Sequence, residues 1–508
     1  MSRWLSVLSL SALLWTPSVR ASDLYGGGSD LPEELRSLLS ASDPSRRRQG
    51  VERLQSLPVR LATPYLLQRL QDGDSAVRAR AAQALGPTAN VAATTALLDG
   101  MSDSDSTVRA ACAEALGQYG ALPKTEQQRA VTLLARAMGD TQFEVRQEAL
   151  RATERLLTAQ VFQLSELPLL LGPVLLRAED ENVGVRRSAL AVLGRLSPLT
   201  LPPELRSRVL LALLGRLSDP ARDVRAESLR SLGLLRAQNA TAAALRLLRD
   251  PTEEVRRQAM LCLGRLAAEA AIPLLREAVE TGSEGQRTAA VQALALYLLP
   301  NTASSLSNEV LAQATQAILS SLGQSALRPL VVESLLSGSE RVAPILLSEL
   351  ARPALGLQQL AILVELLRDL GPKLSPEQRA FATTELSREL FRNRLPREQV
   401  LDAIAVIGDR NIIPLLTSLL SDKDVVVRRR TVQTLRKPHL LDRRALDALT
   451  IASADTDPQV QRQALLALGA LRPVPDLDVA QQRLSFHTEI GAAVTGVGFV
   501  QENAPERL

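Results

Sequence analysis

Asp72-Gly-Asp74-Ser-Ala-Val77-Arg78, followed by an alanine-rich run that ends at Leu85-Gly86, is a segment that recurs along the chain, and this recurrence indicates the fold. The pattern is an acidic residue, four variable positions, Val-Arg, and an Ala/Leu run that closes on Leu-Gly. Successive valines in this pattern are 31, 37, 40, 39 and 31 residues apart, and this period is typical of stacked helix pairs rather than of a closed globular core. The full pattern occurs at Val77, Val108, Val224 and Val255, and related copies occur at Val145, Val185, Val427 and Val460.

Each repeat is expected to contain two helices, A and B in chain order. Helix A is predicted to begin at Pro64, because a proline in the first turn loses no intrahelical hydrogen bond. The same start recurs at Pro273, Pro344 and Pro414. Helix B is predicted to begin three residues before the valine, at a side chain that can accept from first-turn amides. These capping residues are Asp74, Asp105, Asn182, Thr252, Asp424 and Asp457.

Within helix B, Val77, Ala81, Ala84 and Leu85 form the stripe that should face the core. The glycine after this stripe is expected to end the helix in the left-handed conformation. An aspartate five residues before each valine should lie in the turn between the helices, within reach of the arginines that follow the valines. A residue that occurs once per repeat serves the repeat, so we expect a ladder of charge-assisted hydrogen bonds along the stack.

These units resemble HEAT repeats, especially the short bacterial variety that is also found in the lyases that attach bilins to phycobiliproteins. The resemblance covers most of residues 30 to 472. It implies an all-α, HEAT-like α-solenoid of stacked antiparallel helix pairs that forms a curved right-handed superhelix, with B helices on the inner, concave surface. HEAT-like arrays serve unrelated purposes, so the fold does not name the function.

The first residues resemble a secretory signal peptide, residues 1–21. Arg3 precedes an apolar stretch from Trp4 to Trp15, and Ala21 stands at a cleavage-type position. The apolar stretch is shorter than the roughly 20 residues that a membrane span needs, so no integral membrane segment is expected after its removal. The alternatives are an uncleaved amphipathic leader or a misplaced start. We therefore expect export to a periplasm or out of the cell.

Removal of Arg3 and Arg20 with the signal leaves 57 basic residues against 55 acidic ones, a balance of +2. A nucleic-acid partner calls for positive charge concentrated on one face, whereas acids here alternate with the arginines, so no nucleic acid is expected. The two cysteines, Cys112 and Cys262, belong to distant repeats and are expected to be free, buried thiols.

The pattern divides the chain further. After the signal, residues 22–30 form a flexible lead-in, 31–280 regular repeats, 281–410 degenerate repeats, 411–472 C-terminal regular repeats and 473–508 a non-repeat tail. The degenerate region is either a drifted repeat with a long loop or a contact patch. Its neutral polar residues include Asn301, Ser304, Ser305 and Thr315. The tail is either loosely ordered or an extended segment that pairs with the edge of a partner's sheet.

Few residues of the chain are candidates for a catalytic role. His439 and His487 are the only histidines, too few for a histidine-rich di-iron site, and the same scarcity argues against zinc. Neither histidine is expected to reach a cysteine across many stacked repeats. The segment Gly26 to Gly28 follows no predicted strand, so it lacks the context of a phosphate-binding loop. No catalytic residue, metal or cofactor is expected.

The preferred hypothesis is therefore a non-catalytic exported scaffold that binds a protein partner on the concave face. Candidate contact residues are the solvent-facing B-helix side chains Arg80, Arg187, Glu227, Arg257, Arg429 and Arg430, for which ordinary solvated charge is the alternative. The competing hypothesis is an enzyme or chaperone of the bilin-lyase type that acts on a cofactor-bearing protein. It rests on repeat similarity alone, and such an activity works on cytosolic proteins, which the leader sequence argues against.

Overall fold

The computed structural model describes residues 31–90, 93–162, 167–196, 202–303, 306–324, 326–338, 341–352 and 355–469. These residues form helices and turns, with no strand among them. The predicted signal peptide, lead-in and tail, as well as Ser304, Ser305 and His487, lie outside them. The chain divides into two compact units between Tyr297 and Leu298, and the predicted domain boundaries stay predictions. No helix in this described part is both long and apolar enough to cross a membrane.

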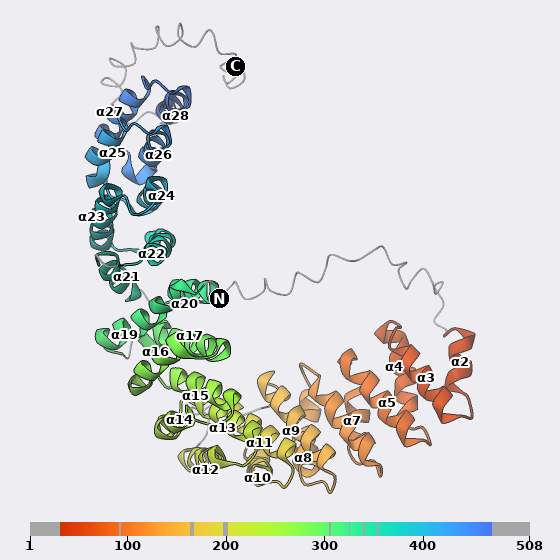
Figure 1. Cartoon of the computed structure of the whole chain (residues 1–508). Helices are drawn as coiled ribbons and strands as arrows, with labels where there is room; N and C mark the ends of the chain where they lie inside the picture. Colours follow the sequence, from red (N-terminus) through yellow and green to blue (C-terminus); the bar gives the residue numbers. More distant parts are fainter. Residues whose placement is uncertain are drawn as a thin grey trace. The chain divides into compact units, whose positions relative to one another are not determined.

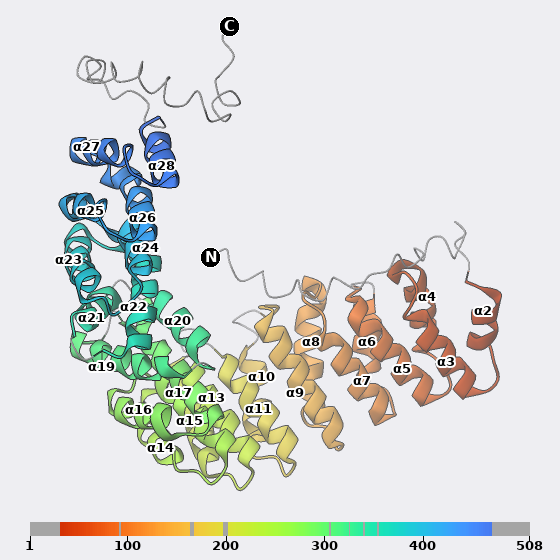
Figure 2. The ribbon, with the colours of Figure 1, turned by 45° about the horizontal axis from the view of Figure 1, so that its top comes forward.

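The first unit is a stack of helix pairs, and Figure 2 shows its A helices and B helices in two separate rows. The A helices are α2 (Glu33–Leu39), α4 (Val59–Arg69), α6 (Thr94–Gly100), α8 (Lys124–Ala137), α10 (Leu167–Arg177), α12 (Pro203–Gly215), α14 (Thr241–Leu247) and α16 (Ile272–Thr281). The B helices are α3 (Pro44–Leu54), α5 (Ser75–Leu85), α7 (Ser106–Gly117), α9 (Phe143–Thr158), α11 (Val183–Arg195), α13 (Arg222–Leu234), α15 (Glu253–Arg265) and α17 (Glu284–Leu298). From α3 to α15, each B helix packs against the next B helix.

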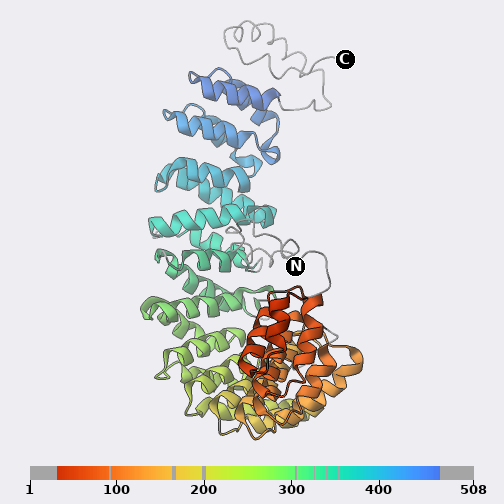
Figure 3. The same cartoon turned by 90° about the vertical axis from the view of Figure 1, so that its right-hand side faces the viewer.

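The second unit continues the same architecture, and its helices follow one another in layers (Figures 1 and 3). A short helix, α18 (Pro300–Ala303), comes before the pairs. The pairs are α19 (Asn308–Leu319) with α20 (Arg328–Leu336), α21 (Val342–Leu350) with α22 (Leu357–Leu370), α23 (Pro376–Arg392) with α24 (Arg397–Ile407), α25 (Ile413–Leu419) with α26 (Val425–Leu435), and α27 (Arg443–Ala452) with α28 (Pro458–Gly469). The degenerate repeats thus keep the helix pairs that their prolines indicated.

The core of the stack is the predicted one. The eight pattern valines are at most 1% exposed, and Ala81 and Leu85 are fully buried beside Val77. Aliphatic burial of this kind is the main favourable contribution to folding. The predicted all-α solenoid of stacked antiparallel helix pairs is therefore confirmed.

Two details of the predicted helices are wrong. Helix α4 begins at Val59, five residues before Pro64, so the proline lies inside the helix. The Thr63 hydroxyl donates to the Val59 carbonyl at 2.7 Å in the turn before Pro64. Thr252 occupies the N-cap of α15, but its side chain accepts no amide there, and its own amide donates to the Asp250 carboxylate at 2.8 Å. The other predicted caps accept first-turn amides, as Asp74 does from Val77 at 3.1 Å.

The repeat glycines also act differently from the prediction, because no glycine of the described chain has a positive φ. They are close-approach positions instead. A methyl group added at Gly264 would lie 2.8 Å from the Ala293 Cα atom, and one at Gly117 would lie 2.7 Å from the Ala152 Cα atom. Left-handed residues come three positions later, at Ala89, Arg236 and Ala267. Glycine at the end of the pattern therefore allows neighbouring B helices to touch backbone to backbone.

We predict that Gly264→Ala destabilises the array by about 1–3 kcal/mol, since the new methyl must push the α17 backbone away. Thermal and chemical denaturation followed by far-UV circular dichroism measures the change. Gly215→Ala is the matched control, because nothing lies within 4 Å of a methyl group there, and it should be neutral or slightly stabilising. Equal effects of the two substitutions would contradict the close-approach role.

Candidate functional site

The most regular charged feature is a ladder of arginine–aspartate pairs along the turns between A and B helices. Each arginine lies in one repeat and bonds the aspartate of the next, as when Arg109 Nε and Nη2 donate to both Asp140 carboxylate oxygens at 2.8 and 3.0 Å. Shortest distances in the ladder are 2.5 to 3.0 Å. Its pairs are Arg47–Asp72, Arg78–Asp103, Arg109–Asp140, Arg146–Asp180, Arg186–Asp219, Arg225–Asp250, Arg397–Asp422 and Arg428–Asp455.

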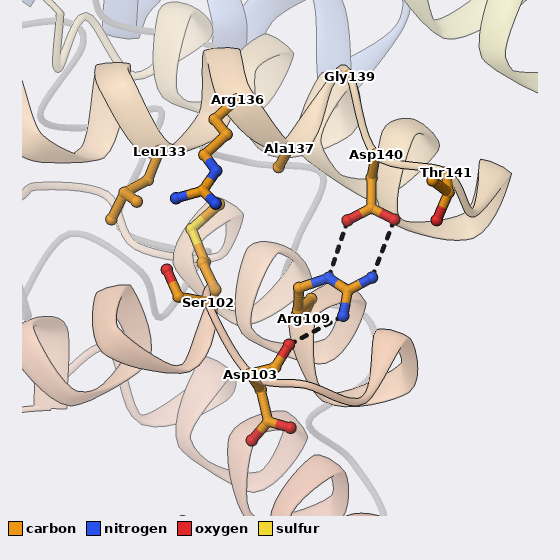
Figure 4. A pocket seen from close by; sticks show the side chains of 10 residues that line it. Ser102, Asp103, Arg109, Leu133, Arg136, Ala137, Gly139, Asp140 and Thr141 are labelled. Carbon is orange, nitrogen blue, oxygen red and sulfur yellow. Dashed lines mark hydrogen bonds and ion pairs between the residues drawn. The ribbon is translucent and has the colours of Figure 1, made fainter.

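Most ladder arginines also donate to a backbone carbonyl of the turn in their own repeat. Arg109 Nη1 donates to the Asp103 carbonyl at 2.9 Å, so one guanidinium ties two consecutive turns together (Figure 4). The predicted ladder is therefore confirmed, with the side-chain pairing running from each repeat to the next. Arg256 donates to the Asp250 carbonyl at 2.7 Å, but Thr281 stands at the aspartate position of the following repeat, and the ladder of the first unit ends there.

The ladder carboxylates are fully engaged. Burial works to raise the pKa of Asp219, but hydrogen bonds from Arg186 and from the Ala221 amide outweigh it and leave the pKa lowered. Asp103, Asp140, Asp180 and Asp250 have lowered pKa values for the same reasons. Carboxylates that are ionised and already accept several hydrogen bonds are poor proton donors, which favours a structural role.

A hollow of about 330 Å³ opens beside this ladder between α6 and α8 (Figure 4). Three ladder aspartates, Asp72, Asp180 and Asp219, receive a second guanidinium from three residues earlier, as when Arg177 approaches Asp180 to 3.0 Å. At Asp103 and Asp140 that position holds Gly100 and Ala137. Ala137 lines the hollow, and Arg136 points from α8 toward it.

The six predicted contact residues lie on B helices, and five of them already have partners. Arg80 pairs with Glu52 at 3.3 Å, Glu227 with Arg230 at 3.1 Å, and Arg257 with Glu254 at 3.3 Å. In the second unit, Arg429 binds both Asp457 carboxylate oxygens and Arg430 lies 3.3 Å from Asp402. Arg187 is exposed. Their role in binding stays a prediction.

Three of these residues belong to a wider charged surface on α9, α11, α13 and α15. Burial raises the pKa of Glu227, Glu154 adds to the rise, and Arg187 and Arg230 oppose it. Near the C-terminus of α15, burial lowers the pKa of Arg265, and its Nη1 atom has no hydrogen-bond partner among the described residues. Sequence reasoning missed Arg265 because only the fold shows that its guanidinium is half-buried.

Sequence reasoning also missed two ladder arginines, Arg47 and Arg397. Neither follows a pattern valine, because Arg47 comes after Arg46 and Arg397 after Pro396. The spacing of 25 residues to Asp72 and to Asp422, the same as between Arg78 and Asp103, is the signal that could have found them.

The cysteines are free and buried as predicted. Burial raises the pKa of both Cys112 and Cys262 to about 12, so neither thiol is a ready nucleophile near neutral pH. Among the described residues, no group of three or more His, Cys, Asp or Glu side chains is placed to hold a metal ion.

The fold and the ladder define an α-solenoid repeat protein. The sequence model of HEAT repeats matches residues 32–117, 63–154, 207–295, 391–469 and 413–485. These matches cover more than half of the chain, so the protein belongs to the HEAT-repeat family. No curated protein matches it in sequence.

Solved structures similar to this chain are also helical arrays of low sequence identity. Importin beta is 12% identical with a TM-score of 0.47, over 91% of this chain and 69% of its own. Kap95 in its complex with Nup1 is 13% identical with a TM-score of 0.46, over 87% and 66%. YibA of E. coli is 18% identical with a TM-score of 0.37, over 60% and 97%. The predicted resemblance to bilin lyases stays a prediction.

We predict that Asp219→Asn destabilises the first unit by about 3 kcal/mol, because it leaves the Arg186 guanidinium without its carboxylate in a site where the aspartate is 2% exposed. Chemical denaturation measures the loss. Asp223→Asn, four residues along the same repeat, removes an exposed carboxylate that pairs with Arg222 at 3.5 Å, and should cost less than about 0.5 kcal/mol. A loss at Asp219 no greater than at Asp223 would refute the structural role of the ladder.

Proposed function

We propose that this protein is an exported, non-catalytic scaffold that binds another protein along the surface of its B helices. The observation that carries the proposal is the row of B helices from α5 to α15, in which each helix packs directly against the next. Such a row offers one extended surface, and extended surfaces of this kind are what solenoids use for binding.

Charge on this surface supports a polar partner. Arg187 is exposed, and its charge acts on Glu227, so residues of α11 and α13 face one another across neighbouring repeats. Arg265 adds a guanidinium with an unmatched Nη1 atom. Charges arranged in this way set the specificity and the rate of association.

The chemistry of the described residues fits a scaffold better than an enzyme. The two thiols are buried with raised pKa values, and the ladder carboxylates are ionised and hydrogen bonded. The signal-like sequence of residues 1–21 supports export. Binding to a protein outside the cytoplasm therefore accounts for the repeat array and the leader together.

We predict that a photo-crosslinking amino acid placed at Arg187 or Arg257 forms a covalent adduct of one defined mass in the cells that make the protein, because these positions face the partner. Immunoblotting and mass spectrometry of the adduct measure the result. The matched control is Leu211 on α12, an A-helix position that is 68% exposed and should give no adduct. Adducts at Leu211 alone, or at no position, would contradict binding on the B helices.

A second prediction concerns export. The mature chain should begin at Ser22 and reside outside the cytoplasm, because cleavage is expected after Ala21. Intact-mass measurement and protease accessibility in spheroplasts check this. A variant with Leu8 and Leu10 changed to Arg should keep its full mass and stay inside, because two charges interrupt the apolar stretch. A full-length chain with an intact Met1 in the cytoplasm would remove export from the proposal.

A further inference from the structure

The turns of the second unit bring together five basic side chains that no ladder aspartate neutralises. They lie on α23, on the 3₁₀ turns η8 (Arg410–Ile412) and η9 (Pro438–Leu440), at the N-cap of η9, and on α27. We call them the basic patch: Arg379, Arg410, Lys437, His439 and Arg444.

Hydrogen bonds hold these segments side by side. Arg410 Nε donates to the His439 carbonyl, and Arg444 Nη2 donates to the Arg410 carbonyl, each at 3.4 Å. Burial lowers the pKa of His439, and the charges of Arg379 and Lys437 lower it further. Arg379 is held in place because it donates to the carbonyls of Leu374 and Pro372 at 3.2 and 3.3 Å. The patch therefore groups four cationic side chains with His439, whose neutral form is favoured, and it draws them from three consecutive repeats.

The carboxylates nearby are already engaged. Asp442 caps α27 by accepting from the Ala445 amide at 3.0 Å, and it pairs with Arg444 at 2.8 Å. Asp409 accepts from the backbone and side-chain nitrogens of Asn411 at 3.0 and 3.2 Å. Within the part of the chain that the structure describes, the ion pairs include Arg444 but none of the other four patch residues. Arg410, Lys437, His439 and Arg444 are exposed.

We propose that the basic patch binds an acidic segment of a partner polypeptide, rich in Asp and Glu. The inference rests on the proposed protein-binding function and adds a second contact, because the patch lies on A helices and the turns before them rather than on the B-helix surface. Guanidinium groups bind carboxylates through paired, charge-assisted hydrogen bonds, and two unpaired guanidiniums and an ammonium are available here.

The chemistry of the patch favours a polypeptide over a nucleic acid. Single strands bind on aromatic side chains that stack with the bases. Residues 409–444 contain no Phe, Tyr or Trp, and Phe381 on α23 is two residues from Arg379, a spacing at which helical side chains do not face each other. Tight binding to a duplex uses a longer track of phosphate contacts than five grouped side chains provide. An acidic peptide needs only a compact set of cations, as found here.

The test measures binding of fluorescein-labelled decaglutamate to the mature full-length chain by fluorescence anisotropy. The double variant Arg410→Gln/Lys437→Gln should raise the Kd about tenfold, because it removes two of the unpaired charges. The control Arg246→Gln/Arg249→Gln removes two exposed arginines of the first unit and should raise the Kd less than twofold. Equal weakening in both variants, or binding no tighter than that of decaglutamine, overturns the proposal.

Two further probes test the class of ligand. Oligothymidylate and phosphatidylglycerol vesicles should bind more weakly than decaglutamate, and tighter binding of either one through Arg410 and Lys437 overturns the assignment. Photo-crosslinking at Arg187 separates this inference from the scaffold function. An adduct that persists while decaglutamate fails to bind leaves the scaffold function standing and removes the acidic-segment inference. If no adduct forms at Arg187 while decaglutamate still binds, the acidic-segment inference stands and the scaffold function is removed.

Discussion

The whole structure depends on one constraint: a pair of thin helices can hide its apolar face only against the next pair. The pattern valines and leucines fill the space between neighbours, and alanine and glycine keep that space narrow. Burial of small aliphatic side chains stabilises such a stack without a central core. Two further features act on this stack: small residues set the distance between repeats, and charged side chains fix their register.

The arginine–aspartate ladder fixes the register. One guanidinium reaches forward to the carboxylate of the next turn and, in most repeats, backward to a carbonyl of its own, so the turns cannot slide independently. The aspartate also accepts an amide two residues later, as Asp140 does from Gln142 at 3.0 Å. The eight pairs give sixteen charged side chains a structural role. Charges outside the ladder, such as Arg187, Arg265 and Lys437, are therefore the informative ones for binding.

The helices could be predicted well from the sequence because the same pattern recurs, so a weak signal in one repeat is supported by the others. The same pattern occurs eight times, so the core valines, most B-helix caps and the ladder could be placed without a structure. Single positions were harder. Pro64 lies inside α4 because the helix can tolerate one missing hydrogen bond. Glycine at the end of the pattern is required by the close approach of the neighbouring helix, not by the conformation of its own backbone. Contacts across repeats, such as those that assemble the basic patch, depend on the stacking geometry and leave no local pattern in the sequence.

The central claim is that each repeat depends only on its neighbours, and removal of one complete repeat tests it most directly. Deletion of residues 72–102, which joins Gln71 to Asp103, leaves Arg47 facing a new ladder aspartate. Far-UV circular dichroism of this variant should show an unchanged helical signal per residue, with a somewhat lower denaturation midpoint. Loss of helical signal throughout the chain would mean that distant repeats form one shared core, and would contradict the account.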